Sequence, residues 1–269
     1  NFFMLIHNID PVAINFFIFE IRWYSLAYIF GILLGWYYAK KIISKLKYSN
    51  NNFQILNSKD FDDLIPYLIL GIILGGRLGY VFIYNFEYYT ENLINILFIW
   101  EGGMSFHGGL VGVTILILFF SKKNNVGLFP LTDIISCAAP IGIFFGRLAN
   151  FINGELYGKV TTFPWGVVFP NAGSEPRHPS QIYEAGLEGF LLFLVMYFLF
   201  VKNKLLAKTG IATLFFLIFY SLFRLISENF REPDIHLGYI FYSLSLGSIL
   251  SLVTIFIALI IYFSNIYKK

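Results

Sequence analysis

Seven predominantly apolar stretches divide this sequence, and they restrict its fold more than any other feature. A helix of about 20 apolar residues can cross a bilayer, because its backbone satisfies its own hydrogen bonds there. Only 13% of the residues are charged, against roughly 25% in a typical soluble domain. We therefore predict an all-α integral membrane protein with about seven transmembrane helices, folded as a single domain over residues 1–269. The predicted spans are 22–39, 64–84, 107–120, 133–152, 181–201, 210–227 and 239–263.

The lysines predict the orientation of these helices. Twelve of the 13 lysines follow odd-numbered spans, and only Lys159 follows an even-numbered one. Because cytoplasmic loops carry an excess of basic residues, the N-terminus is predicted outside and the C-terminus in the cytoplasm. Segments 85–106 and 154–180 then belong to the outer side, where we expect them to cap a site.

None of the six arginines shares the predicted cytoplasmic positions of the lysines. Arg77, Arg147 and Arg224 each lie 13 or 14 residues past the inner end of a predicted span. At the helical rise per residue they reach a similar depth, ~20 Å from that end. Each could form a structural ion pair or extend toward the membrane surface, but three at matched depth favour a shared anion site. The planar guanidinium matches phosphate or carboxylate, and charge inside a membrane is costly to retain without a function.

Polar side chains accompany these arginines at helical spacing. Arg147, Asn150 and Gly154 fall at i, i+3 and i+7 within 146–158, so they share one helix face. Glu228 follows Arg224 by one turn and could pair with it. Tyrosines near the arginines or near the outer end of the first span could contact a ligand, or could belong to the interfacial aromatic belt. They are Tyr24, Tyr80, Tyr84 and Tyr220.

His107 is the candidate general base. It opens the third span at its predicted outer N-terminus, on the same side of the membrane as the arginines. The positive end of the helix dipole favours a neutral imidazole there, which can accept a proton. A hydrogen-bonded structural histidine is the alternative.

Other features predict packing or exclude classes of chemistry. Small-residue stripes should let helices approach closely: Gly31 and Gly35, then Gly71, Gly75 and Gly79, then Gly108 and Gly112. Cys137, the only cysteine, lies near the predicted cytoplasmic end of the fourth span and is predicted to fill the core. The sequence has no Gly-rich nucleotide loop, nucleophile-elbow serine or metal-ligand cluster. We expect no cofactor, no bound metal and no nucleic-acid partner.

Four ordered motifs are spread along the sequence. They read GGMSFHGGL at 102–110, GRLANFINGE at 146–155, RHPSQIYE at 177–184 and FREPD at 230–234. Together with the seven spans, they resemble the bacterial prolipoprotein diacylglyceryl transferase family over nearly the whole chain. Ala149 and Glu101 depart from the glycine and aspartate that are usual in that family.

The resemblance implies transfer of an sn-1,2-diacylglyceryl group from phosphatidylglycerol to the lipobox cysteine of a preprolipoprotein signal peptide. A thioether forms and glycerol phosphate leaves, at the outer face of a multi-pass protein in the bacterial cytoplasmic (inner) membrane. The lipid bilayer itself is then a partner. The family's important positions fall on His107, Arg147, Asn150, Glu155, Gly158 and Arg224, with Tyr24, Tyr220 and Glu228 in support.

These considerations lead to one predicted set of site residues. Catalytic roles are predicted for His107, Arg147, Arg224 and Glu155. Substrate binding is predicted for Asn150, Gly158, Tyr24, Tyr220, Glu228, Arg77 and Tyr80. Arg77 could instead brace an acidic residue.

A transporter of anions or phospholipids is the alternative function. The tripeptide GRL occurs at 76–78 and 146–148, and the similar FRL occurs at 223–225. These three matches would be consistent with a diverged internal repeat. However, the sequence lacks paired half-helices broken by Gly or Pro, and an odd number of spans does not divide into matched halves. A different phospholipid-headgroup enzyme would share the anion site without needing a peptide thiol.

Overall fold

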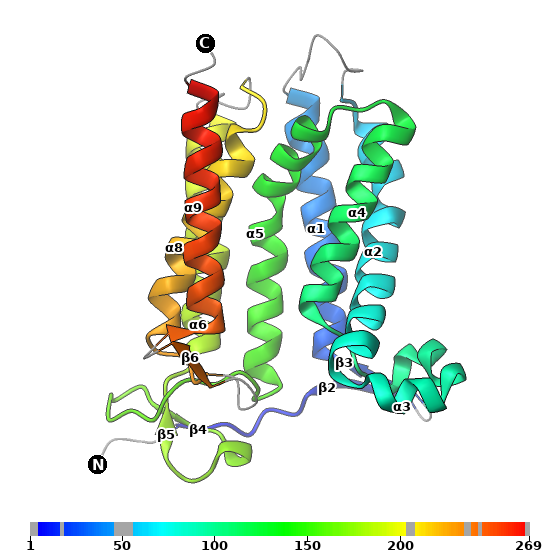
Figure 1. The fold of residues 1–269 in the computed structure, drawn as a ribbon. Coiled ribbons are helices and arrows are strands. Elements are labelled where there is room, and N and C mark those ends of the chain that lie inside the picture. The colour runs from blue at the N-terminus through cyan, green and yellow to red at the C-terminus, as the bar shows by residue number, and fades with distance from the viewer. Residues whose placement is uncertain are drawn as a thin grey trace. The chain divides into compact units, whose positions relative to one another are not determined.

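The computed structural model describes residues 5–16, 19–45, 56–202, 208–233, 238–241 and 244–266. Within these ranges, seven helices are long and apolar enough to cross a membrane (Figure 1). They are α1 (Trp23–Lys45), α2 (Ser58–Tyr84), α4 (Phe106–Asn124), α5 (Leu128–Ile152), the helix Ser180–Lys202, α8 (Ile211–Glu228) and α9 (Leu246–Ile266). The predicted fold class, a helical multi-pass membrane protein, is confirmed.

Several helices extend beyond their predicted spans. α1 continues to Lys45, and α2 starts at Ser58, where the Asn57 side chain caps it by accepting from the Lys59 and Asp60 N–H groups. The added turns are charged, and Lys40 Nζ lies 2.9 Å from Asp62 Oδ2. Hydropathy locates only the apolar part of a helix, so it misses charged turns that prolong the same helix.

The prediction for the seventh span is wrong at its start. Two short strands, β6 (Tyr239–Phe241) and β7 (Leu244–Ser245), precede α9, which begins only at Leu246. The Ser245 hydroxyl caps the new helix by accepting from the Ser248 N–H at 3.1 Å. Because short apolar runs suit a strand as well as a helix, hydropathy does not separate the two.

The chain divides into two compact units, residues 40–131 and residues 1–39 with 132–269. In the first unit, α2 and α4 pack along their glycine stripes. A Cβ on Gly75 would lie 2.8 Å from Gly112 Cα, and one on Gly108 would lie 2.7 Å from Gly79 Cα. The predicted packing role of these stripes is confirmed, because the two backbones approach where no Cβ fits. The single transmembrane domain stays a prediction.

In the larger unit, the helix Ser180–Lys202 is irregular. It runs through α6 (Ser180–Glu184), the π-helical η4 (Ala185–Leu191), α7 (Leu192–Met196) and the π-helical η5 (Tyr197–Lys202). Gly189 allows close contact with α5, since a Cβ there would lie 2.7 Å from Phe144 Cα. Arg147 follows Phe144 by one turn, so this contact brings it near the acidic residues of the irregular helix. π-Helical turns are rare and often occur at functional sites.

Buried Asp133 of α5 fixes the start of α8. Its carboxylate accepts from the Gly210 N–H at 2.5 Å and from the Thr213 N–H at 2.7 Å. Gly210 has no side chain to cap α8, so Asp133 satisfies N–H groups that the helix leaves free. α8 then runs beside α9 (Figure 1).

Short strands cover the end of the larger unit at which α5 terminates (Figure 1). β1 (Leu5–Ile6) pairs in parallel with β4 (Val167–Val168), which pairs antiparallel with β5 (Pro176–Arg177). A 3-10 turn, η3 (Pro170–Ala172), joins β4 toward β5. β2 (Val12–Phe16) and β3 (Phe19–Arg22) form an antiparallel pair that leads into α1.

Candidate functional site

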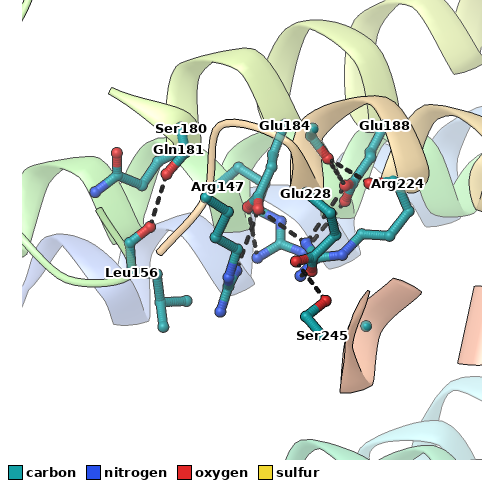
Figure 2. Close-up of polar contacts among 12 residues, drawn as sticks. Arg147, Leu156, Ser180, Gln181, Glu184, Glu188, Arg224, Glu228 and Ser245 are labelled. Carbon is teal, nitrogen blue, oxygen red and sulfur yellow. Dashed lines mark hydrogen bonds and ion pairs between the residues drawn. The ribbon is translucent and has the colours of Figure 1, made fainter. Parts of the chain in front are cut away.

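Six charged side chains meet among the helices of the larger unit (Figure 2). They come from α5, from the helix Ser180–Lys202, from α8 and from the segment directly after α8. They are Arg147, Glu184, Glu188, Arg224, Glu228 and Arg231. We call this set the ion network.

Glu184 stands at the centre of the ion network. Its Oε1 lies 2.8 Å from Arg224 Nη1 and 3.1 Å from Arg231 Nη1, and its Oε2 lies 2.9 Å from Arg147 Nη1. The Glu184 side chain has 0% exposed surface. One carboxylate therefore joins three guanidinium groups, which offset the hydration that it loses on burial.

Glu188 joins the arginines of α5 and α8 a second time. Its Oε2 lies 3.2 Å from Arg147 Nη2, and its Oε1 lies 3.4 Å from Arg224 Nη1. The Ser227 hydroxyl donates to Glu188 Oε1 at 2.9 Å. Glu184 and Glu188 lie one turn apart on the irregular helix, so together they bridge α5 to α8.

Arg224 also pairs with Glu228, one turn further along α8. The predicted pairing of these two residues is confirmed. Glu228 is held in turn by Ser245, whose hydroxyl donates to its Oε2 at 2.9 Å (Figure 2). Because Ser245 caps α9, the start of that helix is tied to the ion network.

Exposure separates the two signs of charge. The side chains of Arg147 and Arg224 are 18% and 12% exposed, whereas Glu184 and Glu188 are fully buried. Three arginines balance three glutamates, so the network carries no net formal charge inside apolar helices. The fully buried carboxylates thus hold in place the two guanidinium groups that keep some exposed surface. Tyr220 lies close enough to interact electrostatically with Glu188 and with both arginines.

Asn150 and Glu155 form a second polar group where α5 ends. Asn150 Nδ2 donates to Glu155 Oε1 at 2.7 Å, and Gln181 Nε2 donates to the Glu155 carbonyl at 2.6 Å. The residues on either side of Glu155 both have positive φ: Gly154 (64°) and, unusually for a non-glycine residue, Leu156 (57°). Tyr24 of α1 lies near both Asn150 and Glu155. Three predicted site residues are therefore neighbours.

Gly158 holds two chain segments together. Its N–H donates to the His178 carbonyl at 2.9 Å, and a Cβ at this position would lie 2.5 Å from the Phe230 carbonyl oxygen. No larger residue fits between these backbones without displacing one of them. These contacts account for the glycine through packing, and its predicted contact with substrate stays a prediction.

Arg77 is buried in the smaller unit and is bonded to backbone. Its three guanidinium nitrogens donate to the carbonyls of Asn95, Ile96, Phe98, Gly102 and Gly103, and its Cζ lies 5.1 Å from the Tyr89 ring centroid. These residues belong to the segment after α2, which folds as α3 (Phe86–Glu91), η1 (Leu93–Leu97) and η2 (Ile99–Glu101). Arg77 therefore braces backbone, not an acidic residue, and the shared anion site predicted for three arginines does not describe its contacts.

His107 and Tyr80 also belong to the smaller unit. His107 is exposed in the first turn of α4, which the Ser105 hydroxyl caps by accepting from the Gly108 N–H at 3.2 Å. Tyr80 stacks on Tyr84 with ring centroids 5.8 Å apart. The other predicted site residues lie in the larger unit, and Asp234 of the fourth motif lies outside the described residues.

Glu184 and Glu188 were not predicted as site residues, although the sequence carries a signal for them. Two carboxylates one turn apart inside an apolar span are as costly as the arginines that drew attention. Arg231 was not predicted as a site residue either. Its position after the sixth predicted span gave no reason to expect burial, although its side chain is buried. Among the described residues, no group of three or more His, Cys, Asp or Glu side chains could hold a metal ion.

The fold and the ion network together define a multi-pass membrane protein with a cluster of paired charges among its helices. The chain belongs to the prolipoprotein diacylglyceryl transferase family, whose sequence profile matches residues 11–264. It is 50% identical over 248 residues to the phosphatidylglycerol–prolipoprotein diacylglyceryl transferase of Rickettsia typhi, covering 92% of this chain and 93% of the relative. It is 49% identical over 249 residues to the protein of the same name from Rickettsia canadensis, covering 93% of this chain and 94% of the relative.

Proposed function

We propose that this chain is a transferase that moves the sn-1,2-diacylglyceryl group of phosphatidylglycerol onto the lipobox cysteine of a prolipoprotein signal peptide. The cysteine sulfur forms a bond to the sn-3 carbon of the diacylated glycerol. The bond between this carbon and the phosphate oxygen breaks. The electron pair leaves with glycerol phosphate, and the thiol proton passes to a base. Family membership with relatives of that name supports this reaction, and the transporter alternative has no such support.

The observation that carries the proposal is the orientation of Arg147 and Arg224. Both arginines are fixed by the buried carboxylates of Glu184 and Glu188, yet both keep exposed surface. Preorganised guanidinium groups stabilise negative charge that grows on a phosphate oxygen, without reorganisation during the reaction. In this proposal they bind the phosphate and stabilise it as it leaves.

The polar group at the end of α5 has an orienting role in this proposal. Asn150, fixed by its bond to Glu155, orients a glycerol hydroxyl or a phosphate oxygen. Tyr24, Tyr220 and Glu228 support the same site. His107 accepts the thiol proton, because a thiol with a reference pKa of about 8.5 must ionise to attack carbon.

Family membership supports a location in the bacterial cytoplasmic membrane, and the lysine distribution supports an orientation with the site toward the outer face. Phosphatidylglycerol can then reach the ion network while its acyl chains remain in lipid. The signal peptide delivers its thiol from the same side. Segment 154–180, which belongs to the same unit as the ion network, caps the site in this proposal.

The direct test combines the purified full chain, phosphatidylglycerol and a lipobox peptide, with mass spectrometry of the peptide. We expect a diacylglyceryl mass gain on cysteine, and none on a peptide whose cysteine is replaced by serine. Absence of this gain from well-folded protein would overturn the proposal.

Two sets of variants assign the roles. Arg147→Lys and Arg224→Lys should lose most of the activity while folding normally, because lysine cannot bind phosphate through a planar fork. Full activity of either variant would contradict recognition by that arginine. For His107→Gln, turnover near that of the wild type at pH 9 would refute an essential base.

A further inference from the structure

A small polar cavity lies beside the Arg224–Glu228 pair in the larger unit. Its volume is about 120 Å³, and its polar lining includes Lys159, Glu228, Asn229, Ser245 and Ser248. At ~30 Å³ for each water molecule, this is the space of about four waters, or of one short polyol. The reaction roles proposed above give the cavity itself no use.

The hydroxyl groups of the cavity come from Ser245, which ends β7 and caps α9, and from Ser248 in the first turn of α9. Ser245 and Ser248 are both buried, and their Oγ atoms lie 3.1 Å apart. The Ser245 hydroxyl also donates to Glu228 Oε2 at 2.9 Å. One wall of the cavity thus offers hydroxyl oxygens and a carboxylate, which can accept from the hydroxyls of a ligand.

Lys159 supplies the opposite chemistry. Its Nζ donates to the Asn229 carbonyl at 3.0 Å, which holds the ammonium at the cavity. It is the one lysine outside the predicted cytoplasmic segments. Its positive charge balances the Glu228 carboxylate in the lining, which suits a neutral ligand better than a cationic one.

The position of Gly247 links the cavity to Arg224. A Cβ on Gly247 would collide with Glu228 Oε1 and would lie 3.4 Å from Arg224 Nη2. α9 therefore passes directly against the Arg224–Glu228 pair, with the cavity next to it. Glu228 thus connects Arg224 to the hydroxyls of Ser245 and Ser248 through a continuous chain of polar contacts.

We propose that this cavity binds the terminal glycerol of the phosphatidylglycerol headgroup, which later leaves as part of glycerol phosphate. Ser248 Oγ accepts a hydrogen bond from one glycerol hydroxyl, and the Glu228 carboxylate accepts from the other. Lys159 disfavours a headgroup that ends in an ammonium. This subsite rests on the proposed function, since it assumes that the phosphate lies on Arg147 and Arg224.

The test compares two lipid donors with the same phosphate and the same headgroup length. Phosphatidylglycerol offers two headgroup hydroxyls, and phosphatidylpropanol offers none. We expect the wild type to prefer phosphatidylglycerol in kcat/KM for transfer to the lipobox peptide. Ser248→Ala should reduce this preference by about 2- to 10-fold, as the loss of one hydrogen bond predicts, and Ser248→Val should reduce it further by filling the cavity.

Ser251→Ala is the matched control. Ser251 lies one turn along α9, is also buried, and donates to the Gly247 carbonyl at 2.8 Å, but it does not line the cavity. This variant should keep the wild-type preference. A second measurement uses free glycerol phosphate and propyl phosphate as inhibitors. The wild type should be inhibited more strongly by glycerol phosphate. This difference should diminish in Ser248→Ala and remain in Ser251→Ala.

Two results would overturn the subsite while the proposed function stands. One is equal use of both donors by the wild type. The other is an unchanged preference in both Ser248 variants. Absence of any transfer from phosphatidylglycerol by the wild type is a distinct result, and it would overturn the proposed function on which the subsite rests.

Discussion

Replacing Glu184 with glutamine removes the charge that joins three arginines while keeping the shape of the side chain. Its two oxygens contact Arg147, Arg224 and Arg231 at 2.8–3.1 Å, and none of its surface is exposed. Removing one partner of a buried ion pair typically costs about 3–5 kcal/mol, because the remaining charges lose their compensation. The glutamine amide also places N–H donors against guanidinium donors, so the arginines must move.

The expected consequence for activity follows from this movement. A displacement of about 1 Å in a positioning group can cost ~100-fold in rate. We expect Glu184→Gln to lower kcat by about that factor, with a smaller change in KM. Glu184→Asp, which keeps the charge but is one methylene shorter, should recover part of the loss. Glu188→Gln should be milder than Glu184→Gln, because the ion pairs of Glu188 are longer, at 3.2 and 3.4 Å.

The assay is transfer to a lipobox peptide by purified protein in detergent, with thermal unfolding measured on the same samples. Glu232→Gln is the control, because Glu232 pairs with Arg177 at 3.3 Å while its side chain is 43% exposed. An exposed pair of this kind contributes about 0–1 kcal/mol. Wild-type kcat in Glu184→Gln, or partial activity that Glu184→Asp fails to improve, would refute a positioning role for Glu184.

Three further predictions concern the supporting structure. Gly158→Ala should lower the free energy of unfolding by about 1–3 kcal/mol, because its Cβ meets the Phe230 and His178 carbonyls. Gly186→Ala is the control, because a Cβ there meets no neighbour within 4 Å. Equal thermal stability of the two variants would contradict the packing role of Gly158. Arg77→Lys should speed hydrogen exchange at residues 95–103, since lysine cannot bond all five carbonyls; unchanged protection would count against the bracing role. Burial and nearby Lys159 lower the pKa of His178 below its ordinary value of 6.5, so the folded state binds fewer protons than the unfolded state. The resulting stability is complete above pH 6.5 and falls as pH drops through the lowered pKa, a trend that His178→Gln should weaken in thermal unfolding measured between pH 7.5 and 5.

Hydropathy and charge were sufficient for the architecture but not for every boundary. The seven spans were predicted because each is apolar over most of its length, and this property needs no partner. The start of the seventh span failed because the apolar residues at 239–241 and 244 adjoin the more apolar helix without a charged break, although they belong to β6 and β7. Helix spacing within one segment also sufficed for the pair of Arg224 and Glu228.

The partners of the arginines could not be predicted from spacing. Arg147 meets Glu184 and Glu188 across about 40 positions of sequence, and this contact depends on the close packing of Gly189 against Phe144. Arg77 shows the converse, because matched depth suggested a shared site although its donors all go to nearby backbone carbonyls. Depth along a helix does not reveal which way a side chain turns, and that direction decides between bracing and binding.

The ion network also has a consequence for how the chain is inserted into a membrane. α5 carries Arg147, the helix Ser180–Lys202 carries Glu184 and Glu188, and α8 carries Arg224. A lone charge on an inserting helix costs up to about 2.5–3.5 kcal/mol, so each of these apolar segments inserts less favourably alone than together with its charge partners. Compensation is complete only when α8, made last of the three, has joined the others. We therefore expect the earlier two helices to stay beside the insertion machinery until α8 arrives, so that the three helices enter the lipid together.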